Sequence, residues 1–299
     1  MKRIRVRNVI NHKGYRTLQI ALGCMFSIIA LSAFALAQSD QDRAWDILNV
    51  GVAEKSTERR AMAVATLGII RKNTRAEGMA EKALEDEKPE VRAAGAYALG
   101  KMGAKKSIPQ LKKALEDNEV SVALAASQAL VTLGDPSGYE AFFTILTGER
   151  KTGSGMVDEQ LKTFKNAKKM ALMGFEEGIN FIPFAGIGYG AFKAIRKDDA
   201  TPVRAAAAKT LGDDKDPRSA QALVQATSDK SWLVRVAALN AIATRNDPSL
   251  LPGVEPNMAD DKDLVRYTAA AVVIRLNNLP KALPKRAPAP ETIPSPGPQ

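Results

Sequence analysis

Residues 85–100 read EDEKPEVRAAGAYALG, and this stretch decides the fold because its pattern returns along the chain. It joins a polar turn to an Ala-rich segment whose apolar residues recur at helical spacing. The other copies are EDNEVSVALAASQALV (116–131), KDDATPVRAAAAKTLG (197–212), SDKSWLVRVAALNAIA (228–243), DDKDLVRYTAAAVVIR (260–275) and, in a degenerate form, EKSTERRAMAVATLG (54–68). A fixed period in this range predicts supersecondary units that stack side by side.

Two charged residues keep a register within the repeat, an Asp followed by an Arg after five intervening residues. Asp117 holds the turn position of its copy, but Ala123 replaces the Arg. The complete pairs are Asp86/Arg92, Asp198/Arg204, Asp229/Arg235 and Asp260/Arg266, of which the last three are each 31 residues apart. Ligand binding by these charges is an alternative, but recurrence at repeat spacing favours a role in stacking.

A second amphipathic stretch precedes most copies, for example Ile108, Leu111 and Leu115 before 116–131. Each unit is therefore predicted to be two helices joined by a tight turn. The many Ala residues let neighbouring helices approach closely, which suits stacking.

The recurring string D-x4-V-R-x-x-A-A-x-A-L-G resembles the HEAT-repeat family, especially its short bacterial members with repeats of about 30 residues. The resemblance extends over nearly all of 41–278. It implies an all-α fold, a right-handed α-solenoid of about six to seven stacked helical pairs. It also implies that the turn Asp and the helix Arg form a ladder of charge-assisted hydrogen bonds between successive units.

The first 37 residues are predicted to be a targeting segment. Its basic region contains no acidic residue, the run from Leu18 to Ala37 is apolar, and Ala35-Leu36-Ala37 before Gln38 has the form of a cleavage site. An uncleaved anchor is the alternative. Both alternatives place the remainder outside the cytoplasm, in the periplasm or secreted.

This segment changes what the composition means. It holds six positive charges, so the net charge of +10 falls to +4 without it, and the basis for predicting nucleic-acid binding is lost. His12 and Cys24, the only residues of their types, also lie in it. The mature chain is therefore expected to have no disulfide, no His or thiolate metal site and no Cys or Ser-His-Asp nucleophile. No cofactor and no small-molecule substrate are expected.

Two further stretches, one acidic and one Pro-rich, are predicted to be exposed to solvent. Asp260-Asp261-Lys262-Asp263 lacks the Gly and the distal Glu of a calcium loop. Residues 280–299 contain seven Pro, which predicts a disordered or polyproline tail after a solenoid at 38–279.

The repeat breaks between Val122 and Val203, in an irregular segment at 148–197. An insertion is one interpretation. We favour the interpretation that the segment consists of degenerate units. These are an enlarged helical pair at 137–175 and a pair with a Gly-rich start at 179–212. Its three Gly at 186, 188 and 190 lack the context of a phosphate-binding loop.

The same segment contains a candidate docking surface, at 149–197. One predicted helix face is basic, and the stretch FIPFAGIGYGAF (181–192) is apolar. A buried structural plug is the first interpretation, and an exposed patch for a partner protein or an anionic membrane is the second. The residues are Lys162, Lys165, Lys169, Phe181, Ile182, Phe184, Ile187, Tyr189 and Phe192.

We expect a non-enzymatic, exported scaffold that binds another protein along the concave surface of the solenoid. The alternative is an envelope-surface adaptor that uses the 149–197 segment. A remote alternative is an enzyme, because bilin lyases also contain short HEAT-like repeats. The export signal and the lack of His and Cys argue against it.

Overall fold

The structure is a computed structural model that describes residues 39–147 and 200–279. These residues form helices and turns, and no strand occurs in the two described ranges. The helices are α2 (Asp40–Val52), α3 (Thr57–Thr66), η1 (Leu67–Ile69), α4 (Thr74–Ala83), α5 (Pro89–Met102), η2 (Lys105–Ser107), α6 (Ile108–Ala114), α7 (Val120–Leu133), α8 (Ser137–Thr147), α12 (Thr201–Leu211), α13 (Pro217–Ala226), α14 (Trp232–Arg245), η3 (Pro248–Leu250), α15 (Leu251–Val254), η4 (Glu255–Ala259) and α16 (Asp263–Asn277).

Local sequence sets the ends of these helices. Ser56 and Asn73 cap α3 and α4, since their side-chain oxygens accept hydrogen bonds from backbone N–H groups of the first turn. Gly103 and Gly134 end α5 and α7 with φ of 80° and 81°. This left-handed conformation, which glycine adopts without strain, turns the chain back toward the next helix. The predicted helical pairs are therefore present.

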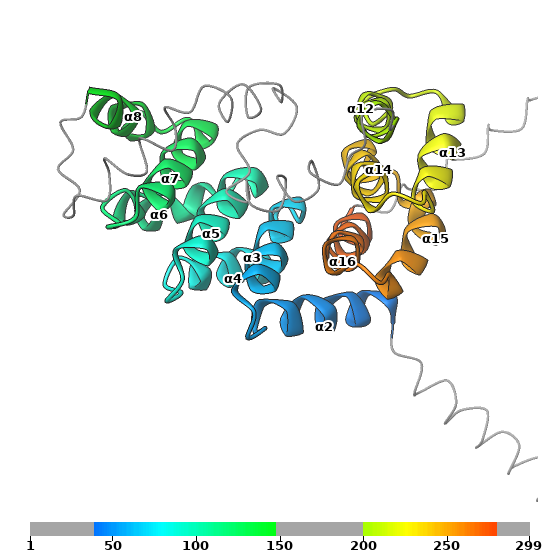
Figure 1. The fold of residues 1–299 in the computed structure, drawn as a ribbon, viewed down its shortest axis with the longest axis horizontal. Helices are drawn as coiled ribbons and strands as arrows, with labels where there is room; N and C mark the ends of the chain where they lie inside the picture. The colour runs from blue at the N-terminus through cyan, green and yellow to red at the C-terminus, as the bar shows by residue number, and fades with distance from the viewer. Residues whose placement is uncertain (1–38, 148–199, 280–299) are drawn as a thin grey trace, which may run out of the picture.

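The pairs stack in two rows (Figure 1). The inner row contains α7, α5 and α3 on one arm and α16, α14 and α12 on the other, with neighbours in this order in contact. The outer row contains α6, α4, α2, α15 and α13, each packed on an inner helix. The described chain is thus an α-solenoid of five complete helical pairs with α8 and α12 at its two ends.

Small residues bring the inner helices together. A Cβ atom added at Gly100 of α5 would lie 2.8 Å from Cα of Ala129 on α7, too close for any side chain. Arg92 and Asp117, near the beginnings of the same two segments, are also in contact. The N-terminal ends of the two helices therefore lie side by side, and so do their C-terminal ends. It follows that the inner helices run parallel. Their beginnings define one edge of the molecule and their ends define the other.

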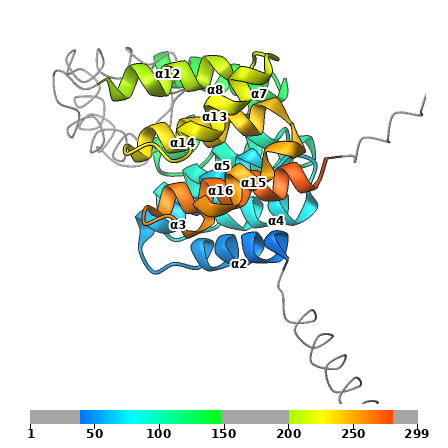
Figure 2. The same cartoon turned by 90° about the vertical axis from the view of Figure 1, so that its right-hand side faces the viewer.

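The order of stacking departs from the order of the sequence. The last helix, α16, packs against α2 and α3, so the final unit lies beside the first one (Figures 1 and 2). The two ends of the stack are therefore α8, the last described helix of the first half of the chain, and α12, the first described helix of the second half. The register of the repeat does not predict this contact between last and first units.

Several sequence predictions fall outside the described residues. They are the targeting segment 1–37, the tail 280–299, the irregular segment 148–197 with all nine candidate docking residues, and Asp198 of the ladder. Of the two pairs predicted at 137–175 and 179–212, the structure describes one helix each, α8 and α12. Within the described ranges, no helix combines the length and the apolar character that a membrane crossing requires.

Candidate interaction surfaces

The Asp/Arg register becomes a ladder that joins successive units. The Arg92 guanidinium donates two hydrogen bonds to the Asp117 carboxylate, from Nε at 2.7 Å and from Nη2 at 2.9 Å. Arg204 contacts Asp229 in the same way, at 3.1 and 3.3 Å. Arg92 and Arg204 therefore each bind the Asp of the following unit.

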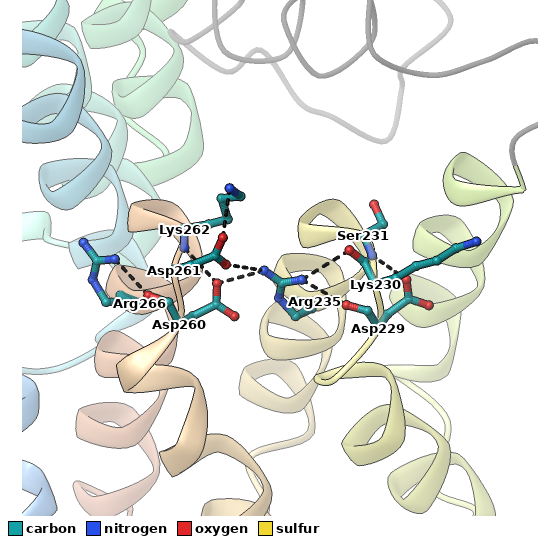
Figure 3. A network of polar contacts seen from close by, with 8 residues as sticks. All are labelled: Asp229, Lys230, Ser231, Arg235, Asp260, Asp261, Lys262 and Arg266. Carbon is teal, nitrogen blue, oxygen red and sulfur yellow. Dashed lines mark hydrogen bonds and ion pairs between the residues drawn. The ribbon is translucent and has the colours of Figure 1, made fainter.

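Arg92 and Arg235 also hold the turns that precede their own helices. Nη1 of Arg92 donates to the backbone oxygen of Asp86 at 3.0 Å, and Nη1 of Arg235 donates to that of Asp229 at 3.0 Å. The Asp carboxylate in turn accepts the backbone N–H two residues later, as Asp229 does from Ser231 at 2.8 Å. Figure 3 shows this chain of contacts over two turns. One guanidinium thus fixes two neighbouring turns relative to each other.

The ladder has one member beyond those predicted. Arg60, in the degenerate first copy, donates to the Asp86 carboxylate from Nε at 2.8 Å and from Nη2 at 2.9 Å. Its position in the repeat is the signal that identifies it. The ladder has no Arg on α7, where Ala123 is completely buried. At the other end, Arg266 bonds to Asp263 of its own helix and to the backbone oxygen of Asp260.

Burial and hydrogen bonding act in opposite directions on the ladder carboxylates. Burial alone would raise the pKa of Asp86, but the hydrogen bonds from Arg60 and from the Lys88 N–H, with the charges of Arg60 and Arg92, hold this pKa below its ordinary value. The ionised form of Asp86 is therefore the one that the fold stabilises.

A different set of contacts joins the last unit to the first, which we call the closure. The Arg59 and Asp263 side chains, near the beginnings of α3 and α16, form an ion pair at 3.1 Å. Near their ends, Nη1 of Arg275 donates to the backbone oxygen of Ile69 at 2.8 Å. The closure therefore keeps α16 and α3 parallel, as the other inner helices are, without a ladder rung.

Arg275 connects three units at the closure. Besides Ile69, it binds Oδ1 of Asn246 through Nε at 3.1 Å and Nη2 at 2.8 Å. Asn246 ends α14 in the left-handed conformation with φ of 53°. Burial lowers the pKa of the Arg275 guanidinium, and the nearby charge of Arg71 lowers it further. Neither Arg275 nor Asn246 was expected from the sequence, because nothing in the repeat distinguishes them.

The closure is also tightly packed. A Cβ atom at Gly51 of α2 would lie 2.6 Å from Cε1 of Tyr267 on α16 and 2.7 Å from Cβ of Ala63 on α3. Burial, followed by the charges of Asp263 and Glu54, raises the pKa of Tyr267. The absence of a side chain at Gly51 therefore makes room for the buried Tyr267 ring.

On α7 and α14 the middle of the inner face of the stack carries no charged side chain. Gly95 of α5 faces α4, since its Cβ would lie 2.8 Å from the Ala80 oxygen. Tyr97 is two residues later, about 200° around the helix, and therefore points away from the outer row. On α7 and α14, the residue at the repeat position of Tyr97 and those one turn before and one turn after it are partly or fully exposed. These inner-face residues are Leu124, Gln128, Thr132, Val236, Asn240 and Thr244.

No group of three or more His, Cys, Asp or Glu side chains in the described part of the chain is arranged to hold a metal ion. The acidic turn at 260–263 is instead occupied by the ladder. Asp260 binds Arg235, Asp261 binds Lys262, and Asp263 binds Arg59 and Arg266.

The fold and the ladder define a HEAT-type helical scaffold. The family model of HEAT repeats matches residues 46–131, 76–150 and 190–274, so the chain belongs to the HEAT-repeat family. HEAT repeats generally mediate protein interactions. No curated protein matches the chain.

Two solved structures match the chain at low structural similarity. Human deoxyhypusine hydroxylase in complex with glycerol has 16% identity and a TM-score of 0.32, covering 80% of this chain and 97% of its own. The complex of CpcE and CpcF of phycocyanin lyase from a species of Nostoc has 21% identity and a TM-score of 0.31, covering 79% of this chain and 95% of its own. At these scores the similarity says nothing about activity.

Proposed function

We propose that this protein is a non-enzymatic, exported scaffold that binds another protein on the inner face of its helical stack. The observation that carries the proposal is the composition of that face. Tyr97, Leu124 and Val236 alternate there with uncharged polar side chains such as Gln128 and Asn240. Protein interfaces combine apolar and aromatic groups with uncharged hydrogen-bonding groups and are poor in charge at their centre.

The closure places the inner helices of both halves in one row, in which the repeat positions of α16 that match Leu124, Gln128 and Thr132 are buried. Because α16 packs against α3, the inner row continues from α7 through α5, α3 and α16 to α14. A partner that lies along this row would contact residues from both halves. An extended surface of this kind is typical of solenoids.

The proposal that the protein is not an enzyme depends on its side-chain chemistry. The only His and the only Cys precede residue 38. Without the targeting segment, the chain lacks the two side chains that most often serve as general base and as thiolate nucleophile at neutral pH.

Export is proposed from the sequence of residues 1–37. The first described helix begins at Asp40 with Ser39 as its cap, so cleavage after Ala37 would leave the helix and its cap intact. The intact mass of the protein isolated from cells tests this proposal. A species that begins at Gln38 and is recovered outside the cytoplasm is expected, and a full-length cytoplasmic protein would contradict export.

Site-specific photo-cross-linking in cells tests the binding surface. A photoreactive amino acid replaces Gln128 or Asn240 on the inner row, and Gln110 or Gln225 on the outer row serves as the matched control. All four positions are exposed. We expect one protein adduct shared by the two inner positions and absent from the two outer ones.

A second substitution makes the test specific. Asn240→Lys on α14 should reduce the adduct formed from position 128 on α7, because one partner would span both halves. Gln225→Lys should leave that adduct unchanged. Adducts that form equally from inner and outer positions would refute an inner-face binding site.

A further inference from the structure

Five exposed cations gather at the edge where the inner helices end, and we call them the basic edge. Arg71 and Lys72 follow η1, Lys101 lies in the last turn of α5, and Lys105 and Lys106 form the beginning of η2. All five side chains are exposed. They come from two consecutive connections between units, which are separated by one repeat.

Packing places these two connections side by side. A Cβ atom at Gly68 of η1 would lie 2.9 Å from Cβ of Lys101 and 3.2 Å from Cα of Ala98. The chain after η1 therefore leaves the molecule next to the end of α5. The two connections that carry the five cations therefore lie next to each other.

Within the described residues, the five cations are not neutralised by direct ion pairs. None of them takes part in the ion pairs seen within 39–147 and 200–279. The carboxylates of Glu77 and Glu81 on α4 accept hydrogen bonds from Oγ of Ser107, at 3.0 and 2.7 Å. On one side the basic edge is bounded by Asp40 and Asp42 in the first turn of α2.

Lys72 occupies a position that favours glycine. Its φ is 53°, in the left-handed region where the next two units have Gly103 and Gly134. An L side chain in this conformation costs free energy, because its Cβ atom crowds the following carbonyl oxygen. A positively charged side chain is present here despite that cost.

The opposite edge of the same arm is acidic. Glu85, Glu87, Glu90 and Glu116 are exposed around the turns that contain the ladder. The two edges are separated by the length of α5, which with 14 residues is about 21 Å. This exceeds the Debye length of about 8 Å at physiological ionic strength, so the acidic edge does not cancel the charge of the basic edge. A molecule polarised in this way takes one orientation on an anionic plane, with the basic edge toward it.

The chain also enters the fold at this edge. Helix α2 runs antiparallel to α3, so Ser39 lies on the side where α3 ends, and the last described residues after α16 lie on that side too (Figure 2). The segment expected to carry the basic and apolar targeting signal therefore joins the fold beside the basic edge.

We propose that the basic edge of Arg71, Lys72, Lys101, Lys105 and Lys106 docks on an anionic phospholipid surface. Surface lysines and arginines each strengthen such binding additively, and salt screens the attraction. This docking uses the ends of the inner helices, away from the middle of the inner face where Gln128 and Asn240 lie.

Sedimentation of the full chain with vesicles tests the proposal. Vesicles of phosphatidylcholine alone are compared with a mixture that contains phosphatidylglycerol. The triple variant Lys101→Glu, Lys105→Glu, Lys106→Glu should bind the anionic vesicles about 100-fold more weakly than the parent protein, and this difference should shrink in high salt. Binding to the neutral vesicles should not change, since any insertion of the apolar N-terminal run is common to both proteins.

Two further triple variants serve as matched controls. Lys55→Glu, Lys88→Glu, Lys230→Glu makes the same change of charge at exposed positions of the ladder edge and should have little effect. Lys162→Glu, Lys165→Glu, Lys169→Glu changes the other candidate membrane surface. If this variant alone loses binding, or if the ladder-edge control loses as much as the basic-edge variant, the proposal is overturned.

Amine-reactive labelling of the parent protein gives a site-resolved result that does not depend on any variant. Anionic vesicles should protect Lys101, Lys105 and Lys106 and leave Lys55 and Lys88 reactive. Protection that appears in a lipid-free cell extract but not with vesicles would identify an acidic protein as the partner and would refute the lipid proposal. Equal reactivity of all five lysines in every condition would refute it as well.

Discussion

The ladder arginines hold equivalent places in the repeat but are not equally satisfied. Arg92 binds Asp117 through two nitrogen atoms, whereas Arg235 binds Asp260 through Nη2 alone, at 2.8 Å. The Nε atom of Arg235 is buried and has no hydrogen-bond partner. A buried donor without a partner costs free energy, so the two rungs should differ in their contribution to stability.

Replacing the two arginines tests this difference. Arg235→Ala should lower the free energy of unfolding by about 2–3 kcal/mol, because Asp260 would keep a half-buried charge without its main partner. Arg92→Ala should cost about 1 kcal/mol more, since it removes a bidentate pair. Chemical denaturation measures both. Asp261→Ala, at the exposed second partner of Arg235, is the control and should change little. An unaltered stability in both arginine variants would show that the ladder does not hold the units together.

Stability should also depend on pH through Asp86. Its folded pKa is below its ordinary value, so its contribution is complete above the unfolded pKa of about 4 and is lost as the pH falls through the folded pKa. We expect the free energy of unfolding to decrease as the pH falls below about 5. Asp86→Asn should flatten this dependence and lower the stability at neutral pH. A variant that keeps the full slope would exclude Asp86 as its source.

At the scale of the element, close approach of helices depends on residues without large side chains. Alanines form much of the buried core of α5, α7 and α16. Gly51 is a stricter case, because α2, α3 and α16 meet there and leave no room for a methyl group. Gly78 of α4 differs, because a Cβ atom added there would have no atom within 4 Å. Glycines in this chain thus have different roles, which only the neighbouring helices distinguish.

The two glycines give a prediction with opposite signs. Gly51→Ala should destabilise the protein by about 1–3 kcal/mol, because an overpacked core must shift. Gly78→Ala should stabilise it by about 0.5–1 kcal/mol, since alanine favours an exposed helix. Thermal unfolding of both variants measures the difference. Stabilisation by Gly51→Ala would mean that α2 does not pack against Tyr267 as described.

At the scale of the whole molecule, the closure makes one stack out of two halves. The last unit packs against the first, and α8 and α12 are left at opposite ends of the stack (Figure 1). The contact includes the Arg59–Asp263 ion pair, the hydrogen bonds of Arg275 and the buried Tyr267. The halves are therefore expected to associate without a covalent connection between α8 and α12.

Cutting the chain tests this association. A protease site introduced between residues 148 and 199 would separate the half with α2–α8 from the half with α12–α16. We expect the two fragments to elute together in size-exclusion chromatography after cleavage. Adding Arg275→Ala should weaken their association, whereas Arg218→Ala, at an exposed ion pair outside the closure, should not. Separation of the fragments directly after cleavage would show that the closure does not hold them.

The helical pairs and the ladder could be predicted from the sequence for a physical reason. The register depends on short-range periodicity, so the repeat itself shows that Arg60 and Arg92 have the same role. The inner face could not be located from the sequence, because the count from Gly95 to Tyr97 begins with the contact between Gly95 and α4. The nine candidate docking residues at 149–197 remain a prediction, since they lie outside the described residues.

The sequence by itself determined the helix pairs, their side-by-side stacking and the rungs of the ladder, because these depend on spacing within a turn or between adjacent repeats. Only the tertiary structure decided that the last unit lies beside the first. The hydrogen bond from Arg275 to Ile69 joins residues 206 positions apart, and no repeated pattern connects them. Shape decided this contact, since the space above Gly51 accepts the Tyr267 ring, and complementarity of that kind exists only after both helices are in place.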